Sequence, residues 1–365
     1  MYIYKNPNWA NFTWDKDIIL NLLSRVKLKQ GYLLGKMDTL GFDIKEKAIL
    51  NILTEDVIKS SEIEGQILNT EQVRSSIAKR LGIDIGSNIF VERDVEGIVE
   101  MMLDATQNYS QTITKDRLCG WQSSMFPGSY SGLYKVKTGC YRDDKNGPMQ
   151  VVSGAIGKEK VHFQAPAAVV LDVEMNKLID YINNENDNTD LIIKSGIVHL
   201  WFVILHPFED GNGRIARALT DMLLARSENS SNRFYSMSSQ IKKVKKSYYK
   251  SLEITQKSSL DITDWLQWFL ENLLIAIDNS EILLKFVLQK AEFWQKNQSS
   301  SLNERQIKVL NMALDDFKGN LTTTKWAKIC KCSQDTATRD IADLIGKGIL
   351  IKQGEARATQ YIINF

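Results

Sequence analysis

The chain has 365 residues, of which 43% are hydrophobic and 25% are charged, an ordinary balance for a soluble globular protein. Its 46 Lys and Arg residues nearly balance its 44 Asp and Glu residues, so bulk charge favours no polyanionic partner. Five prolines and mostly helical spacing of the apolar residues predict a mainly α fold.

The N-terminal stretch is polar and aromatic and lacks the apolar core of a signal peptide. The longest apolar run, 197–205, contains His199 and is too short to span a bilayer. The four cysteines form no CxxC pair and have only three histidines to join them in a metal site. We therefore expect a cytoplasmic protein with reduced thiols and no membrane partner.

In chain order, the first helix is predicted over 15–31, and an apolar segment follows at 45–53. Thr54 is predicted to cap a second helix, because Glu55 and Asp56 place acid in its first turn, and Gly65 is predicted to end it. On this helix Ser60 and Glu64 share one face. Further helices are expected over 70–81 and 91–107.

Two short β-prone runs, 149–152 and 161–163, lie around Gly154 and Gly157 and predict a β-hairpin. Helices are expected over 169–183, 190–205, 213–226 and 262–289. The segment 190–205 is strongly apolar, so we expect it to be a central, buried helix.

The pattern changes beyond the serines at 299–301, which are predicted to form a linker. Helices over 304–314, 323–329 and 333–347 precede two β-like stretches, 349–352 and 361–363. Three helices followed by a hairpin are typical of a winged helix-turn-helix. Gln334, Thr338 and Arg339 are expected to face outward, where contact with DNA and contact with protein are equally compatible with a mild excess of basic residues.

The segment 206–217 reads HPFEDGNGRIAR and combines groups suited to phosphate chemistry. Pro207 ends the apolar helix at His206, and Gly211 and Gly213 leave backbone N–H groups uncovered where the next helix begins. A helix N-terminus with exposed amides attracts anions. Arg214 and Arg217 project from one side of that helix, and the Asp210 carboxylate could bind Mg²⁺ carried by nucleotide phosphates.

These twelve residues are similar to the Fic-domain signature HPFx(D/E)GNGRxxR, with every defined position filled. The resemblance implies that His206 is the catalytic base, that Asp210 holds Mg²⁺, and that ATP is the co-substrate. It implies that Gly211, Asn212, Gly213 and Arg214 bind the phosphates and that Arg217 binds the γ-phosphate. Tyr248 and Tyr249 are expected near the adenine, although both are equally compatible with a place in the core.

The resemblance extends beyond the signature. Ser60, Glu64 and Gly65 fit the family's inhibitory pattern (S/T)xxxE(G/N), which implies that Glu64 binds Arg217 and that Ser60 helps to hold the helix in place. The predicted hairpin stands where the family has a target-docking flap. There a substrate segment adds a strand alongside the residues Met149, Gln150, Val151 and Val152.

Together these features predict a Fic helical core with a β-hairpin flap and a C-terminal winged helix. The expected domains are 1–108, a helical region with the inhibitory helix; 109–298, the catalytic domain; and 299–365, the winged helix. The expected function is transfer of AMP from ATP to a Tyr, Thr or Ser hydroxyl of a target protein and of the chain itself, restrained by Glu64. The oligomeric state stays open, a homodimer included.

The loop also partly matches a dinucleotide-binding pattern. Residues 211–216 also match G-x-G-x-x-A, but a proline-containing stretch separates them from any preceding strand, and no acid for a ribose follows at 230–234. Two alternatives remain. One is removal of AMP from a modified target with the help of Glu64, and the other is a nucleotide-sensing, DNA-binding regulator. An intact His206 and Asp210 favour an enzyme.

Overall fold

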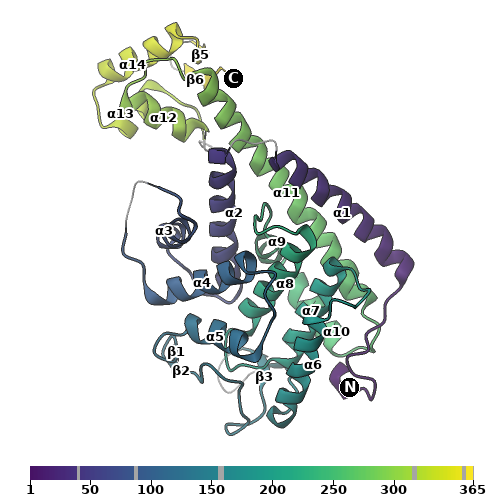
Figure 1. The fold of residues 1–365 in the computed structure, drawn as a ribbon. Coiled ribbons are helices and arrows are strands. Elements are labelled where there is room, and N and C mark those ends of the chain that lie inside the picture. The colour runs from purple at the N-terminus through teal and green to yellow at the C-terminus, as the bar shows by residue number, and fades with distance from the viewer. Residues whose placement is uncertain (39–41, 86–88, 155–159, 315–318, 356–358, 365) are drawn as a thin grey trace. The chain divides into compact units, whose positions relative to one another are not determined.

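The computed structural model describes residues 1–38, 42–85, 89–154, 160–314, 319–355 and 359–364, and Figure 1 shows its fold. The chain divides into two compact units, residues 1–280 and 281–365, and the division falls inside one helix, α11 (Thr263–Lys296). None of the described helices is both long enough and apolar enough to cross a bilayer.

The first unit is mainly helical. Its other helices are η1 (Ile3–Lys5), α1 (Lys16–Asp38), α2 (Phe42–Ile63), α3 (Thr70–Leu81), α4 (Arg93–Gln107), α5 (Lys115–Met125), η2 (Ala168–Val170), α6 (Leu171–Asn183), α7 (Leu191–Leu205), α8 (Asn212–Glu228), α9 (Met237–Lys243) and α10 (Lys245–Gln256). α7 lies at the centre and packs along α8, because nearly all of its side chains are apolar and buried. α1 runs along α11, where Lys29 pairs with Asp278 at 2.9 Å (Figure 1).

α2 differs from the prediction of a helix that begins at Thr54. It is one helix from Phe42 to Ile63, and Thr54 is buried inside it, donating from Oγ1 to the Leu50 carbonyl at 2.6 Å. A threonine can satisfy its hydroxyl within a helix in this way, so its capping preference did not decide the boundary. The end of the helix is as expected, since Gly65 follows with a positive φ of 88°.

The described strands of this unit form two antiparallel hairpins. β1 (Tyr130–Ser131) pairs with β2 (Tyr134–Lys135), and this small hairpin was not predicted. β3 (Gln150–Ser153) pairs with β4 (Lys160–Gln164), which confirms the strands of the predicted hairpin. The tip of that hairpin, with Gly157, lies outside the described residues.

The second unit contains α12 (Glu304–Leu314), α13 (Thr323–Cys330), α14 (Gln334–Gly346) and the antiparallel pair β5 (Leu350–Gln353) and β6 (Gln360–Ile363). Its core gathers around the buried Trp326 with Leu310, Ile341 and Leu344. The serines at 299–301 lie between the ends of α11 and α12. Helices and hairpin follow one another in the predicted order.

Candidate active site

The first element of the site is the turn at His206, which follows the last residue of α7. His206 has a left-handed backbone, with φ 49° and ψ 57°, and its N–H still donates to the Phe202 carbonyl at 2.9 Å. This conformation is costly for a residue with a side chain. Pro207, the next residue, prevents the helix from continuing. The chain therefore leaves the α7 axis at His206, the residue that carries the imidazole.

The imidazole of His206 is held in one orientation and is neutral. Its Nδ1 lies 3.3 Å from the Val203 carbonyl, so Nδ1 carries the proton and Nε2 keeps a free lone pair. Burial, aided by the nearby Arg142, lowers the pKa of His206 to about 4, although the Val203 contact, Glu64 and Asp210 oppose the shift. At neutral pH the ring can therefore accept a proton.

The loop between α7 and α8 is fixed from inside. Phe208 is fully buried, and the Asn212 side chain accepts from the Phe208 N–H at 3.0 Å and donates to the Phe208 carbonyl at 2.7 Å. Gly211 has a φ of 91°, and a Cβ there would lie 2.7 Å from Met125. The Asn212 amide is thus used within the loop, and its backbone N–H, at the start of α8, is the group that it offers to an anion.

Two buried arginines of α8 lie beside this helix start. Arg214 donates from Nη1 to Gln66 at 2.8 Å and stacks over the Phe126 ring, and its Nη2 lies 3.7 Å from Asp210. Arg217 is 2% exposed, so its charge requires a partner. Burial by itself lowers the pKa of Arg217, but Glu64, together with Tyr248 and Tyr249, outweighs that effect and the net shift is upward.

That partner comes from the end of α2. Glu64 Oε1 lies 2.8 Å from Arg217 Nη2, while Ser60 accepts from Arg217 Nε at 2.9 Å and, through its carbonyl, from Nη2 at 2.8 Å. A Cβ built on Gly213 would lie only 2.0 Å from Glu64 Oε1. The carboxylate therefore lies directly against the first turn of α8, at the anion-attracting end of the helix. Ser60 contacts Arg217 rather than the loop.

Asp210 is partly exposed and presents a carboxylate beside the same helix start. It accepts from the Gly211 N–H at 2.5 Å and from the Ser131 hydroxyl at 2.6 Å. Among the described residues no group of three or more His, Cys, Asp or Glu side chains could hold a metal ion. A single carboxylate nevertheless fits Mg²⁺ that arrives with nucleotide phosphates, because such ions keep few protein ligands.

Two residues at the loop were not found from the sequence. Arg142 is buried and donates from Nε to the His206 carbonyl and from its backbone N–H to the Pro207 carbonyl, both at 2.8 Å. Its Nη2 also donates to Pro166 at 2.6 Å. Ser131 reaches Asp210 from the β1–β2 hairpin. Neither lies in a motif, and an isolated Arg or Ser gives no signal of such long-range contacts.

The two tyrosines of α10 have different surroundings. Tyr248 is 2% exposed, and its hydroxyl lies 2.8 Å from Nε2 of the buried His199. Tyr249 is 39% exposed, and both Glu64 and Arg217 influence its pKa, which burial raises to about 12. Of the two rings, Tyr249 has the face that a bound base could reach. In the β3–β4 hairpin, Gln150 and Val152 are exposed and Val151 is half-buried, while the Met149 carbonyl accepts from the Ala165 N–H.

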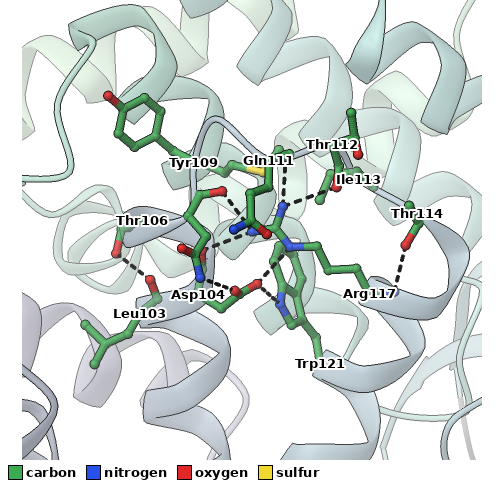
Figure 2. Close-up of polar contacts among 12 residues, drawn as sticks. Leu103, Asp104, Thr106, Tyr109, Gln111, Thr112, Ile113, Thr114, Arg117 and Trp121 are labelled. Carbon is green, nitrogen blue, oxygen red and sulfur yellow. Dashed lines mark hydrogen bonds and ion pairs between the residues drawn. The ribbon is translucent and has the colours of Figure 1, made fainter.

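A hollow of about 550 Å³ between α3, α4 and α5 lies apart from these residues. Figure 2 shows its polar wall, where Arg117 donates to the Asp104 carboxylate at 2.8 Å and Trp121 donates to the same carboxylate at 2.7 Å. All three Arg117 nitrogens have partners, since the others reach the carbonyls of Gln111, Thr112, Asp104 and Asn108. The Arg117 and Asp104 side chains are thus bound within the fold, and we assign this network a structural role.

Comparison with known proteins agrees with the resemblance of the loop. Residues 112–224 match the Fic/DOC family, and residues 2–83 match a domain of unknown function, DUF4172. The chain is 24% identical over 194 residues to protein adenylyltransferase and cysteine protease IbpA of Histophilus somni, covering 49% of this chain and 4% of that protein. It is 24% identical over 185 residues to the probable protein adenylyltransferase aq_aa38 of Aquifex aeolicus, covering 50% of this chain and 52% of that protein. The matches thus span about half or less of these relatives.

Solved structures extend the likeness in fold. A Fic family protein from Desulfovibrio desulfuricans G20 superposes with a TM-score of 0.54 at 17% identity, covering 98% of both chains. A Fic domain containing signaling protein from Bacteroides thetaiotaomicron VPI-5482 gives a TM-score of 0.52 at 19% identity, over 74% of this chain and 97% of that one. The mainly helical fold with small hairpins is a Fic fold. The chain therefore contains a Fic/DOC family domain and is distantly homologous to protein adenylyltransferases.

Proposed function

We propose that this protein transfers AMP from ATP to a Tyr, Thr or Ser hydroxyl of a target protein and of itself, and that Glu64 restrains the reaction. The observation that carries the proposal is the Glu64 carboxylate against Arg217 and the first turn of α8, beside His206. A site that accommodates a carboxylate among a guanidinium and helix N–H groups has the chemistry to accommodate a phosphate.

In the proposed reaction the acceptor hydroxyl oxygen attacks the α-phosphorus of ATP. A new O–P bond forms, the bond from the α-phosphorus to the bridging oxygen breaks, and pyrophosphate leaves. His206 Nε2 takes the hydroxyl proton, which its neutral state allows. Arg214 and the α8 amides hold the phosphates in line, and Arg217 holds the γ-phosphate. Mg²⁺ bound with the phosphates through Asp210 would neutralise part of their charge.

The restraint follows from the same contacts. While Arg217 is paired with Glu64, it cannot also hold the γ-phosphate, and the carboxylate repels that phosphate. ATP then binds with its α-phosphate displaced from the line of attack. The target segment would align with the exposed β3–β4 hairpin, whose Val152 and Val161 are both more than two-fifths exposed.

The test is incorporation of label from α-labelled ATP by the wild type, by Glu64→Gly, and by Glu64→Gly combined with His206→Ala. We expect Glu64→Gly to raise labelling of the chain and of proteins in a host lysate by roughly 5- to 150-fold. Adding His206→Ala should remove the gain, because loss of a general base costs about 10²–10⁴-fold. Equal, easily measured labelling by the wild type and Glu64→Gly would show that Glu64 does not restrain transfer.

One alternative uses the same residues in the opposite direction. In this alternative, Glu64 and His206, which interact electrostatically, act together on a water molecule that removes AMP from a modified target. In that case the wild type would release AMP from a labelled target, and Glu64→Gly would lose the activity.

The second unit supports a further candidate role, because α12, α13, α14 and the β5–β6 hairpin follow the layout of a winged helix-turn-helix. Thr338 and Arg339 on α14 are exposed, as a helix that reads DNA requires. If this unit binds DNA, its affinity for DNA should fall steeply between low and physiological salt. Arg339→Ala should also weaken DNA binding. The absence of a gel shift at low salt would favour a protein partner.

A further inference from the structure

We propose that Lys242 and Lys245 are positioning residues that hold Glu64 on Arg217 by binding the last carbonyls of α2. The proposal rests on the proposed inhibitory role of Glu64 and identifies what holds that residue in place. Both lysines lie at the junction of α9 and α10, far along the chain from α2.

The carbonyls at the end of α2 show why lysines are needed there. The last four carbonyls of a helix have no partner within the helix. Here the Ser60 carbonyl accepts from Arg217, and the Ser61 carbonyl accepts from the N–H groups of Glu64 and Gln66. The last two belong to Glu62, whose carbonyl also accepts from the Gly65 N–H at 3.2 Å, and to Ile63. Their partners from other elements are Lys242, which donates to Glu62 at 2.9 Å, and Lys245, which donates to Ile63 at 2.5 Å.

Lys242 makes a second contact that strengthens the attachment. Its Nζ also lies 3.4 Å from Oε2 of the Glu62 side chain, whose other oxygen accepts from Lys59 at 2.9 Å. Hydrogen bonding to Lys59, with a smaller contribution from Lys242, lowers the pKa of Glu62. Lys242 therefore binds both the backbone and the carboxylate of one residue. Cations at this end of α2 are also favoured by the helix dipole.

The position of these contacts links them to the site. Glu64 is the residue directly after Ile63, so fixing the carbonyls of Glu62 and Ile63 limits where the Glu64 carboxylate can reach. Three cations from three elements, Arg217 of α8, Lys242 of α9 and Lys245 of α10, hold the final turn. Removing the two lysines leaves the turn attached through Ser60 and Glu64, which bind Arg217, and through Gln66, which binds Arg214. Both arginines are ones that the phosphates of ATP would claim.

The test compares Lys242→Met, Lys245→Met and the double variant with Lys243→Met and Lys246→Met, two exposed lysines on the same helices. Label incorporation should rise roughly 2- to 30-fold in the first set, the range that corresponds to losing a cation from a helix C-terminus, and stay at the wild-type level in the controls. Lys242→Arg and Lys245→Arg conserve the positive charge, so they should keep most of the restraint, with label incorporation close to that of the wild type. In the Glu64→Gly background the lysine changes should add nothing.

Hydrogen exchange provides a measurement independent of activity. The N–H groups of Gly65 and Gln66 donate to carbonyls of the same turn, and they should exchange faster in Lys242→Met and Lys245→Met than in the wild type or the controls. Unchanged exchange together with unchanged labelling would overturn the inference. A Glu64→Gly variant without increased labelling would instead refute the proposed function, and the exchange rates would still decide whether the lysines hold the turn.

Discussion

Two arginines of the first unit, the partly exposed Arg117 and the buried Arg217, each pair with a carboxylate at 2.8 Å, yet their surroundings differ. Arg117 has partners on every nitrogen, and its carboxylate, Asp104, is bound by Trp121 and Asn108 as well (Figure 2). Arg217 Nη1 is buried and has no well-formed hydrogen bond among the described residues, although the guanidinium influences the nearby Tyr248 phenol.

The difference separates an arginine that holds the fold from one that can exchange its partner. Replacing Asp104 by a ligand would break a network in which each polar atom is already satisfied. Replacing Glu64 by a phosphate would break the ion pair between Glu64 and Arg217. The phosphate oxygens would in turn offer acceptors to Arg217 Nη1, which has no well-formed hydrogen bond among the described residues. Arg214 has the same property, since its Nε is buried without a partner among the described residues. Arg214 and Arg217, the two arginines expected to hold phosphate, are thus both incompletely hydrogen-bonded among the described residues.

The largest expected effect tests the structural arginine. Arg117→Met should lower the free energy of unfolding by about 3 kcal/mol, because it removes the donors that bind the Asp104 carboxylate and the carbonyls of Gln111, Thr112, Asp104 and Asn108. Denaturant unfolding followed by tryptophan fluorescence measures the loss. In the Glu64→Gly background the folded fraction should transfer label at the unchanged rate, and a specific loss of transfer would remove the distinction between the two arginines.

The next effect concerns ligand binding at Arg217. At about 100 times its dissociation constant, ATP with Mg²⁺ should stabilise Glu64→Gly by about 2.7 kcal/mol and the wild type by less, because Glu64 competes for the same guanidinium. A thermal shift assay measures both. ADP, which lacks the γ-phosphate, is the control and should stabilise the two proteins alike. Equal shifts with ATP would argue against competition between Glu64 and the γ-phosphate.

Arg217→Met should lower the free energy of unfolding by about 1–2 kcal/mol. This loss is smaller than that expected for Arg117→Met, even though Arg217 is the more buried of the two arginines. The released Glu64 side chain is 29% exposed and can turn to water, so the main loss is the partner of the Ser60 carbonyl. Label incorporation should not rise as it does in Glu64→Gly, since the γ-phosphate loses its ligand as well. A rise to the Glu64→Gly level would show that Arg217 serves inhibition alone.

The smallest effect is that of pH on transfer. The pKa of His206 is lowered from its ordinary 6.5 to about 4, so the base is already neutral across pH 6–8, and the proton-accepting form is lost only as pH falls towards 4. Removing Glu64, which raises this pKa, shifts it further in the same direction. Single-turnover rates of Glu64→Gly should differ by less than about twofold between pH 6 and 8. A pH profile of the transfer rate with its midpoint near 6.5 would mean that the pKa of His206 is not lowered.

Local patterns predicted much of the fold. α3 has the bounds expected from its apolar spacing, and the turn at His206 follows from Pro207, because both depend on neighbours in the sequence. The predicted start of α2 at Thr54 was wrong, because the buried Thr54 hydroxyl donates to a carbonyl inside the helix. The small hairpin β1–β2 was missed because strands of two residues give no periodic signal.

The site was predictable where residues are contiguous and not where distant segments meet. The 206–217 loop could be recognised as a unit, and the contact between Glu64 and Arg217 was expected from the resemblance and is present. The roles of Arg142, Ser131, Lys242 and Lys245 depend on backbone carbonyls and side chains far along the chain. Carbonyls are identical in every residue, so no sequence pattern indicates which one a buried cation will find.

The attachment of Glu64 to the same chain as Arg217 has a consequence for how the protein responds to its surroundings. A tethered group competes at an effective concentration, commonly in the millimolar range for short connections, that is set by geometry and does not change with the amount of protein. Dilution or low expression would therefore leave the fraction of restrained molecules unchanged. ATP abundance, or a partner that pulls on the end of α2, would change it, so the protein would report on its environment and not on its own level.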